Sequence, residues 1–154
     1  VYKRQAVLGA DVPVCMTAEA QRMQGIGEQL APVANLPPHW MVLVNPGVDC
    51  PTRAVFEGLE RKDNAPMADV PRFGGFADLI DWLSHQRNDL EPPACTVAPV
   101  ISEVLVALRQ TTSLARMSGS GATCFGLYAT QAEATAAVER ISRSSWWVVA
   151  APIR

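Results

Sequence analysis

The strongest constraint on the fold is a strand–helix–strand succession near the C-terminus. Residues 124–129 form a short apolar run that is typical of a buried strand, and residues 146–151 form another. Between them, residues 131–142 are rich in Ala, follow a helical pattern and begin after Thr130, a good N-cap. Two strands joined through a helix are typical of a βαβ or split βαβ unit. We therefore expect a fold in which helices and strands share one core.

The preceding elements extend this unit to a two-layer architecture. Residues 40–45 are a continuous apolar run that predicts another buried strand. Residues 53–60, 73–86 and 99–112 have helical patterns, and residues 115–123 are a loop rich in Gly and Ser. The order β, α, α, α, loop, β, α, β predicts an α+β fold, a two-layer α/β sandwich of ferredoxin-like type.

A pair of prolines, Pro37 and Pro38, separates this sandwich from the first part of the chain. Paired prolines favour extended, non-helical backbone, so residues 34–39 are expected to form a linker. We therefore divide the chain into residues 1–36, which form the end of one domain, and residues 37–154, which form a second domain.

The first segment has the pattern of elements that begin upstream. Residues 2–8 resemble the last turns of a helix that stops at Gly9, and residues 12–16, 18–23 and 28–33 have strand patterns, with a glycine bend between the last two. The chain also starts without Met. We expect a fragment whose upstream portion is missing.

Composition and charge exclude several classes of protein. Hydrophobic residues make up 49% of the chain and charged residues 18%, which predicts a packed domain in place of a disordered tail. The net charge is −2, and the Lys and Arg residues are scattered, so no basic stripe indicates nucleic-acid binding. No apolar run approaches the roughly 20 residues that a membrane-crossing helix needs.

The cysteines and histidines argue against a metal or redox site. The four cysteines are widely spaced without a Cys-x-x-Cys pair, and neither His39 nor His85 has a neighbouring Cys or His at the spacing of metal ligands. We expect no metal site within this chain. Free cysteines in apolar surroundings are typical of a reduced, cytoplasmic compartment.

The first residue that could carry chemistry is Asp11, in the sequence Leu-Gly-Ala-Asp-Val-Pro-Val. Its carboxylate lies at a predicted helix-to-strand corner among small and apolar residues. Such surroundings would desolvate the carboxylate in part and hold it in one orientation, as a general base requires. The alternative is that Asp11 hydrogen-bonds within its own turn, as Asp commonly does.

A second candidate is the small-residue loop formed by Ser118, Gly119, Ser120, Gly121 and Ala122. Small residues let the backbone approach a ligand closely, and successive N–H groups can form an anion-binding nest. The loop joins a helix to a strand and lacks the Gly-Lys-Ser/Thr of a phosphate-binding P-loop. The alternative is a flexible connector.

A third candidate is the segment from Pro46 to Phe56, in which a strand end, a Pro/Gly loop and a helix follow one another. Such a succession is a common setting for a substrate pocket. Thr52 is expected to cap the helix. Phe56, one turn into that helix, could line the pocket or belong to the core, as most aromatic residues do.

In this order along the chain, these three segments resemble the GHMP kinase superfamily. The motifs that carry the resemblance are collinear and span nearly the whole chain: Leu-Gly-Ala-Asp-Val-Pro-Val at 8–14, Gly-Ile-Gly-Glu at 25–28, Val-Asn-Pro-Gly-Val at 44–48, Pro-Thr-x-x-x-Phe at 51–56, Asn-Asp-Leu-Glu at 88–91 and Met-Ser-Gly-Ser-Gly-Ala-Thr-Cys-Phe at 117–125.

The resemblance implies a bacterial, cytoplasmic small-molecule kinase of the non-mevalonate isoprenoid pathway. It would use ATP and Mg²⁺ to phosphorylate the 2-hydroxyl of 4-diphosphocytidyl-2-C-methyl-D-erythritol. In the family, the aspartate that corresponds to Asp11 takes the hydroxyl proton. The segment that contains Thr52 and Phe56 lines the cytidine pocket, where the aromatic ring stacks on cytosine. The loop of residues 118–122 braces the phosphate region.

The resemblance also implies that motifs are missing. Residues 1–36 would be the tail of the family's N-terminal, ATP-binding domain, and residues 37–154 its C-terminal domain. The family's N-terminal lysine and its Gly-Leu-Gly-Ser-Ser loop, which holds the ATP phosphates, do not occur here. We expect the isolated chain to be inactive. The alternatives are a GHMP kinase for homoserine, mevalonate or a sugar, and a non-catalytic ferredoxin-like binding module.

Overall fold

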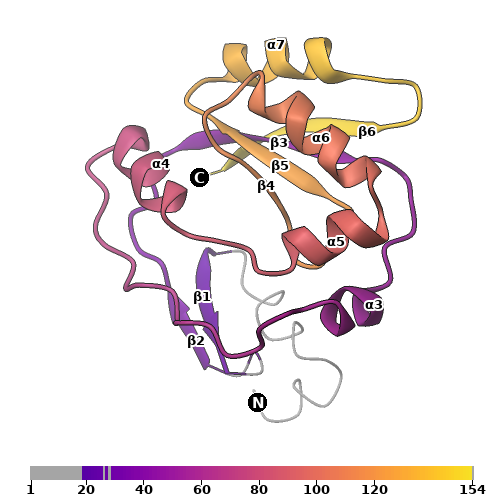
Figure 1. The fold of residues 1–154 in the computed structure, drawn as a ribbon. Coiled ribbons are helices and arrows are strands. Elements are labelled where there is room, and N and C mark those ends of the chain that lie inside the picture. The colour runs from indigo at the N-terminus through magenta and orange to yellow at the C-terminus, as the bar shows by residue number, and fades with distance from the viewer. Residues whose placement is uncertain (1–18, 26, 28, 154) are drawn as a thin grey trace. The chain divides into compact units, whose positions relative to one another are not determined.

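The computed structural model describes residues 19–25, 27 and 29–153, which divide into two compact units. The first unit comprises residues 1–36 and 69–73, and the second comprises residues 37–68 and 74–154 (Figure 1). The expected helix at residues 2–8 and the expected strand at 12–16 lie outside the described residues.

The first unit contains a β-hairpin. Strand β1 (Gln21–Gln24) pairs antiparallel with β2 (Gln29–Pro32), as the two strand patterns predicted. Gly25 has a φ of 69° in the turn, a left-handed conformation that favours glycine. Within the same unit, Arg22 forms an ion pair of 2.7 Å with Asp69.

The second unit is built on a four-stranded antiparallel sheet with the strand order β4-β5-β3-β6. The strands are β3 (His39–Asn45), β4 (Ala115–Met117), β5 (Cys124–Tyr128) and β6 (Trp147–Ile153). Because β5 and β6 both run antiparallel to β3, which lies between them, they run parallel to each other. Helix α7 (Gln131–Ile141) connects them, so the predicted split βαβ unit is confirmed.

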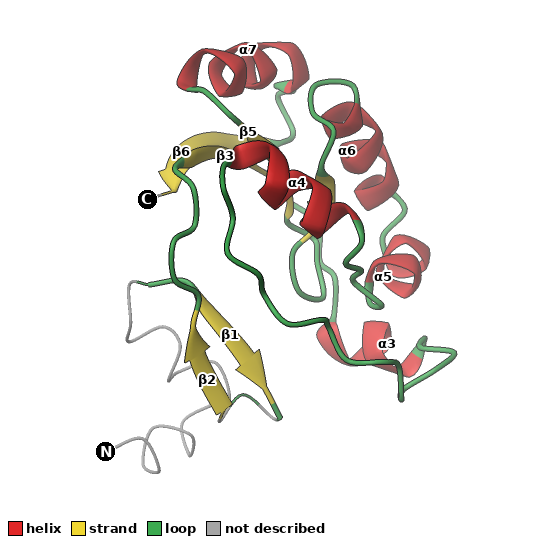
Figure 2. Cartoon of the chain, turned by 90° about the vertical axis from the view of Figure 1, so that its left-hand side faces the viewer, coloured by secondary structure: helices red, strands yellow, loops and turns green. Residues whose placement is uncertain are grey.

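Four further helices lie between β3 and β4. They are α3 (Thr52–Glu57), α4 (Phe76–Ser84), α5 (Glu91–Val97) and α6 (Val100–Arg109). Figure 1 and Figure 2 show α6 and α7 together on one side of the sheet. The succession of strands and helices gives the predicted two-layer α+β sandwich of ferredoxin-like type.

The core of this unit fills the space between the sheet and the helices α6 and α7. Alternate residues of β3, Val42 and Val44, are fully buried, as expected for one face of a strand. Side chains at helical spacing on α6 and α7 pack against them. Those buried residues are Ile101, Val104, Leu105, Leu108, Ala134, Ala137 and Ile141.

One element differs from the sequence-based expectation, and another decides between two alternatives. Residues 115–117, predicted as part of a loop, form strand β4, because they pair with residues 124–126 of β5. The motif at residues 88–91, followed by two prolines, predicts either the start of a helix or a tight turn, and helix α5, which begins at Glu91, confirms the first alternative. Pro92 and Pro93 lie in its first turn, where proline is tolerated since those N–H groups have no intrahelical acceptor.

Candidate functional site

The loop between β4 and β5, residues 118–122, is held in a tight turn; we call it the Ser-Gly loop. The backbone N–H of Ser118 donates to the carbonyl of Thr123 at 2.8 Å, and that of Gly121 donates to the carbonyl of Ser118 at 3.0 Å. Gly119 and Gly121 have φ values of 55° and 94°, which side chains rarely allow. Among the described atoms, the N–H groups of Gly119 and Ser120 have no hydrogen-bond acceptor. The loop therefore presents two backbone donors that suit an anion.

The segment before α3 contacts this loop directly. The hydroxyl oxygens of Thr52 and Ser120 lie 2.9 Å apart, and the Cys50 thiol donates to the Ser120 carbonyl at 3.3 Å. Burial raises the pKa of the Cys50 thiol, with smaller contributions from Asp49 and Cys95, so the thiol keeps its proton and remains a donor. The structure thus brings two of the sequence-predicted segments together.

The role expected of Thr52 as a helix cap is wrong. Pro51 occupies the N-cap position of α3, no side chain caps this helix, and Thr52 is its first helical residue. In this position the Thr52 hydroxyl is oriented toward Ser120. The contact between two distant segments replaces a local cap.

Phe56 is not a core residue. Its neighbour Val55 is fully buried, whereas Phe56 is 50% exposed. The Phe56 ring lines a cavity of about 500 Å³, together with residues of the segment that follows α3, the turn between α4 and α5, and Gly119 of the Ser-Gly loop. The core alternative is therefore wrong, and a half-exposed aromatic ring faces a cavity that suits a small molecule.

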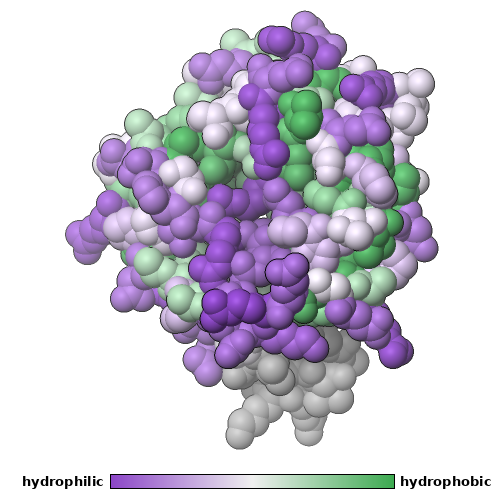
Figure 3. Space-filling model, in the orientation of Figure 1, coloured by the Kyte–Doolittle hydropathy of each residue, from purple (hydrophilic) through white to green (hydrophobic). Residues whose placement is uncertain are grey.

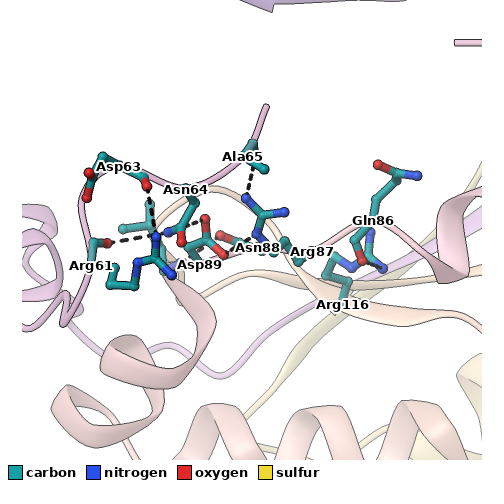
Figure 4. A network of polar contacts seen from close by, with 10 residues as sticks. Arg61, Asp63, Asn64, Ala65, Gln86, Arg87, Asn88, Asp89 and Arg116 are labelled. Carbon is teal, nitrogen blue, oxygen red and sulfur yellow. Dashed lines mark hydrogen bonds and ion pairs between the residues drawn. The ribbon is translucent and has the colours of Figure 1, made fainter. Parts of the chain in front are cut away.

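The walls of this cavity are joined by a polar network (Figure 4). Arg87 donates to the Asp89 carboxylate at 2.8 Å and to the Ala65 carbonyl at 2.6 Å. Asn64 donates to the other Asp89 oxygen at 3.0 Å. Figure 3 shows hydrophilic side chains gathered in the centre of the face turned toward the viewer. The cavity therefore combines an aromatic ring with cationic side chains, among them Arg61, Lys62 and Arg87.

Asn88 is a site residue for which the sequence alone indicates no role beyond its place in the Asn-Asp-Leu-Glu motif. Its side-chain oxygen accepts from the N–H of Leu90 at 3.0 Å, which is a local turn contact. Its amide nitrogen donates to the carbonyls of Met117 at 3.0 Å and Gly119 at 2.8 Å. These partners lie about thirty positions away in the sequence, and no local spacing signals them.

Glu91 holds the strand that leads into the Ser-Gly loop. One of its carboxylate oxygens accepts from the Met117 N–H at 3.1 Å, and the other from Arg109 at 3.2 Å. Nearby, burial lowers the pKa of Arg116, which nevertheless donates to the carbonyls of Leu83 and Gln86 at the end of α4. The Asn-Asp-Leu-Glu motif at 88–91 thus connects the loop to the start of α5 and to α6, and Arg116 connects the preceding strand to the end of α4.

A comparison with protein-family models places this arrangement in a known family. The model described as "GHMP kinases C terminal" matches residues 57–146, more than half of the chain. The chain belongs to the GHMP kinase family. The match includes the Asn-Asp-Leu-Glu motif and the Ser-Gly loop of this GHMP kinase domain.

Several curated relatives of this GHMP kinase chain are named "4-diphosphocytidyl-2-C-methyl-D-erythritol kinase". The chain is 58% identical to the protein of that name from Dinoroseobacter shibae and 51% identical to that from Paracoccus denitrificans. The matches cover 97% and 96% of this chain, and 54% and 56% of the relatives. The chain therefore spans about half the length of the curated relatives it matches.

A solved structure supports the same assignment. The chain resembles the crystal structure of a 4-(cytidine 5'-diphospho)-2C-methyl-D-erythritol kinase with a TM-score of 0.69 and 29% sequence identity. The match covers 97% of this chain and 56% of that one. The α+β fold of a GHMP kinase C-terminal domain is thus established by both sequence and structure.

Asp11, the predicted base, lies outside the described residues. Within the described part of the chain, no group of three or more His, Cys, Asp or Glu side chains is arranged to hold a metal ion. No helix in that part is long and apolar enough to cross a membrane.

Proposed function

We propose that this chain supplies the acceptor side of a kinase that transfers the γ-phosphoryl group of ATP to the 2-hydroxyl of 4-diphosphocytidyl-2-C-methyl-D-erythritol, a step of the non-mevalonate isoprenoid pathway. One observation carries the proposal: the 2.9 Å contact between Thr52 and Ser120, which joins the helix of Phe56 to the Ser-Gly loop. An aromatic surface and two backbone donors therefore lie in one domain. The names of the relatives support this substrate.

Phosphoryl transfer depends on positioning and charge stabilisation more than on covalent chemistry of the protein. In our proposal Asp11 accepts the proton of the 2-hydroxyl as the oxygen attacks phosphorus. Residues 1–36 form the end of an ATP-binding domain, and residues 37–154 form the domain that holds the acceptor. The three cysteines of the described part are free thiols, in keeping with the cytoplasmic location that we propose.

The Ser-Gly loop fits a phosphate group. The N–H groups of Gly119 and Ser120, which no described atom accepts from, would donate to phosphate oxygens of ATP. Mg²⁺ would enter with the nucleotide, where it neutralises charge on the phosphates when bound. The loop's part is to hold these two donors in a fixed direction.

Replacing Phe56 with Ala should raise the KM for the cytidyl acceptor. Aromatic stacking on a nucleobase contributes about 1–3 kcal/mol, so we expect an increase of about tenfold or more, with kcat at saturation nearly unchanged. Steady-state kinetics of the complete protein measure both constants. Trp147→Ala is the matched control, because Trp147 is a similarly exposed aromatic residue, at 57% against 50% for Phe56. An unaltered KM in Phe56→Ala would contradict the stacking role.

A panel of acceptors tests the proposed substrate. The purified complete protein is incubated with ATP, Mg²⁺ and one of four alcohols: 4-diphosphocytidyl-2-C-methyl-D-erythritol, homoserine, mevalonate or galactose. We expect ADP release with the cytidyl compound only. Preferred turnover of another alcohol would indicate a different GHMP kinase, and binding of the cytidyl compound without turnover would indicate a non-catalytic module.

A further inference from the structure

The side chain of Asn88 uses both of its N–H donors and its oxygen to bind two backbone segments. Its two N–H groups donate to the carbonyls of Met117 and Gly119, at 3.0 and 2.8 Å, and its oxygen accepts from the N–H of Leu90 at 3.0 Å. A primary amide has two donors, and both are directed at the Ser-Gly loop and the residue before it. Asn88 therefore fixes the loop to the turn between α4 and α5.

The bond to Gly119 also sets the direction of a neighbouring donor. The carbonyl of Gly119 and the N–H of Ser120 belong to one peptide unit, the peptide is planar, and in the trans form these groups point in opposite directions. With the carbonyl held by Asn88, the N–H of Ser120 is directed away from Asn88. That N–H is one of the two that have no acceptor among the described atoms.

The next peptide unit is held by other residues. The carbonyl of Ser120 accepts from the Cys50 thiol, and the N–H of Gly121 in the same unit donates to the carbonyl of Ser118. The Ser120 hydroxyl contacts Thr52. Among the described residues, Asn88 is the one whose side chain holds the Gly119 carbonyl, so the direction of the Ser120 N–H depends on it.

We propose that Asn88 is a positioning residue for phosphoryl transfer, which aims the Ser120 N–H at an oxygen of the transferring phosphoryl group. The inference rests on the function proposed above. Donors that are already oriented toward developing charge stabilise a transition state without the cost of reorganisation. Loss of Asn88 therefore lowers kcat more than it weakens acceptor binding.

Two substitutions isolate the donors of Asn88. Asn88→Asp keeps one oxygen that can accept from the Leu90 N–H, but its second oxygen, also an acceptor, faces the carbonyls of Met117 and Gly119. Asn88→Ser keeps a hydroxyl that can accept from the Leu90 N–H and is too short to reach those two carbonyls. In the complete protein at pH 8 we expect both variants to lower kcat about tenfold or more. Removal of one oriented donor to an oxyanion lowers a rate by about 10²–10³, and the Ser120 N–H is here misoriented and not removed, so the expected effect is smaller. The KM for the cytidyl acceptor stays within about twofold.

The pH dependence separates the two variants. A carboxyl group that faces two carbonyl oxygens has a raised pKa, because nearby acceptors disfavour the anion. On acidification the carboxylate introduced by Asn88→Asp gains a proton, which restores one donor. The kcat ratio of wild type to Asn88→Asp therefore narrows as the pH falls from about 8 to about 6, whereas the ratio for Asn88→Ser stays constant.

Thr111→Val is the control for a general loss of stability. Thr111 is partly buried and hydrogen-bonds to Tyr128 at 2.8 Å, away from the Ser-Gly loop. We expect a lower Tm with unchanged kcat in this variant. If both Asn88 variants keep the wild-type kcat, or if only their KM rises, the positioning role of Asn88 is wrong, while the proposed function stands. Absence of phosphoryl transfer by the wild-type protein would overturn the proposed function instead.

Discussion

Replacement of Asp11 by Asn in the complete protein should lower kcat for phosphorylation of the cytidyl acceptor about a thousandfold. A positioned general base contributes about 10²–10⁴ to a rate, and the amide of Asn cannot take the hydroxyl proton. The substrate Kd should stay within about twofold, because the two side chains have nearly the same shape. Single-turnover kinetics and equilibrium titration measure the two quantities separately.

Glu139→Gln serves as the matched control for Asp11→Asn. It also converts a carboxylate into an amide, on the exposed surface of α7, and should leave both kcat and Kd unchanged. A variant of Asp11 that loses binding but turns over normally at saturation would show that this carboxylate holds the substrate and is not the base.

The second large effect concerns the core of the sandwich. Leu105 on α6 is 2% exposed, and Leu105→Ala should lower the free energy of unfolding by about 2–5 kcal/mol, since both the transfer free energy and the cavity left behind count against the folded state. Urea unfolding, followed by the signal of the tryptophans, measures the change.

The adjacent residue provides a strict comparison for the core prediction. Val106 lies on the same helix but is 54% exposed, so Val106→Ala should change the free energy of unfolding by less than about 1 kcal/mol. Equal destabilisation by the two substitutions would mean that the face of α6 that contains Val106 is also buried, which would contradict the core described above.

Much of the sandwich could be predicted because its elements have strong local patterns. Strand β3 is an unbroken apolar run, and α7 begins with a capping box in which Thr130 and Glu133 hydrogen-bond each other's backbone N–H groups. The split βαβ arrangement followed from the order of β5, α7 and β6. Such elements are specified within a few residues of the sequence.

The elements that the sequence did not decide depend on distant partners. Strand β4 has three residues, too few for an alternating pattern, and forms through pairing with β5. Helix α5 carries two prolines at its start, which in sequence are compatible with either a helix start or a tight turn. Their conformations are decided by tertiary contacts and not by local propensity.

In the candidate site, too, some features follow from local sequence and others depend on distant contacts. The composition of the Ser-Gly loop indicated an anion-binding nest, since small residues are visible in the sequence. Helix α3 has six residues, so periodicity could not decide which of Val55 and Phe56 faces the core. The contacts of Asn88 and Thr52 cross long sequence separations, and only the fold brings them to the loop.

The position of the phosphoryl group on the product tests the central claim most directly. The complete protein is incubated with ATP, Mg²⁺ and 4-diphosphocytidyl-2-C-methyl-D-erythritol, and the product is analysed by phosphorus and carbon NMR. We predict stoichiometric ADP and a new phosphomonoester coupled to C2 of the methylerythritol group. Consumption of ATP without this phosphomonoester, or a phosphoryl group on another hydroxyl, would contradict the proposed function.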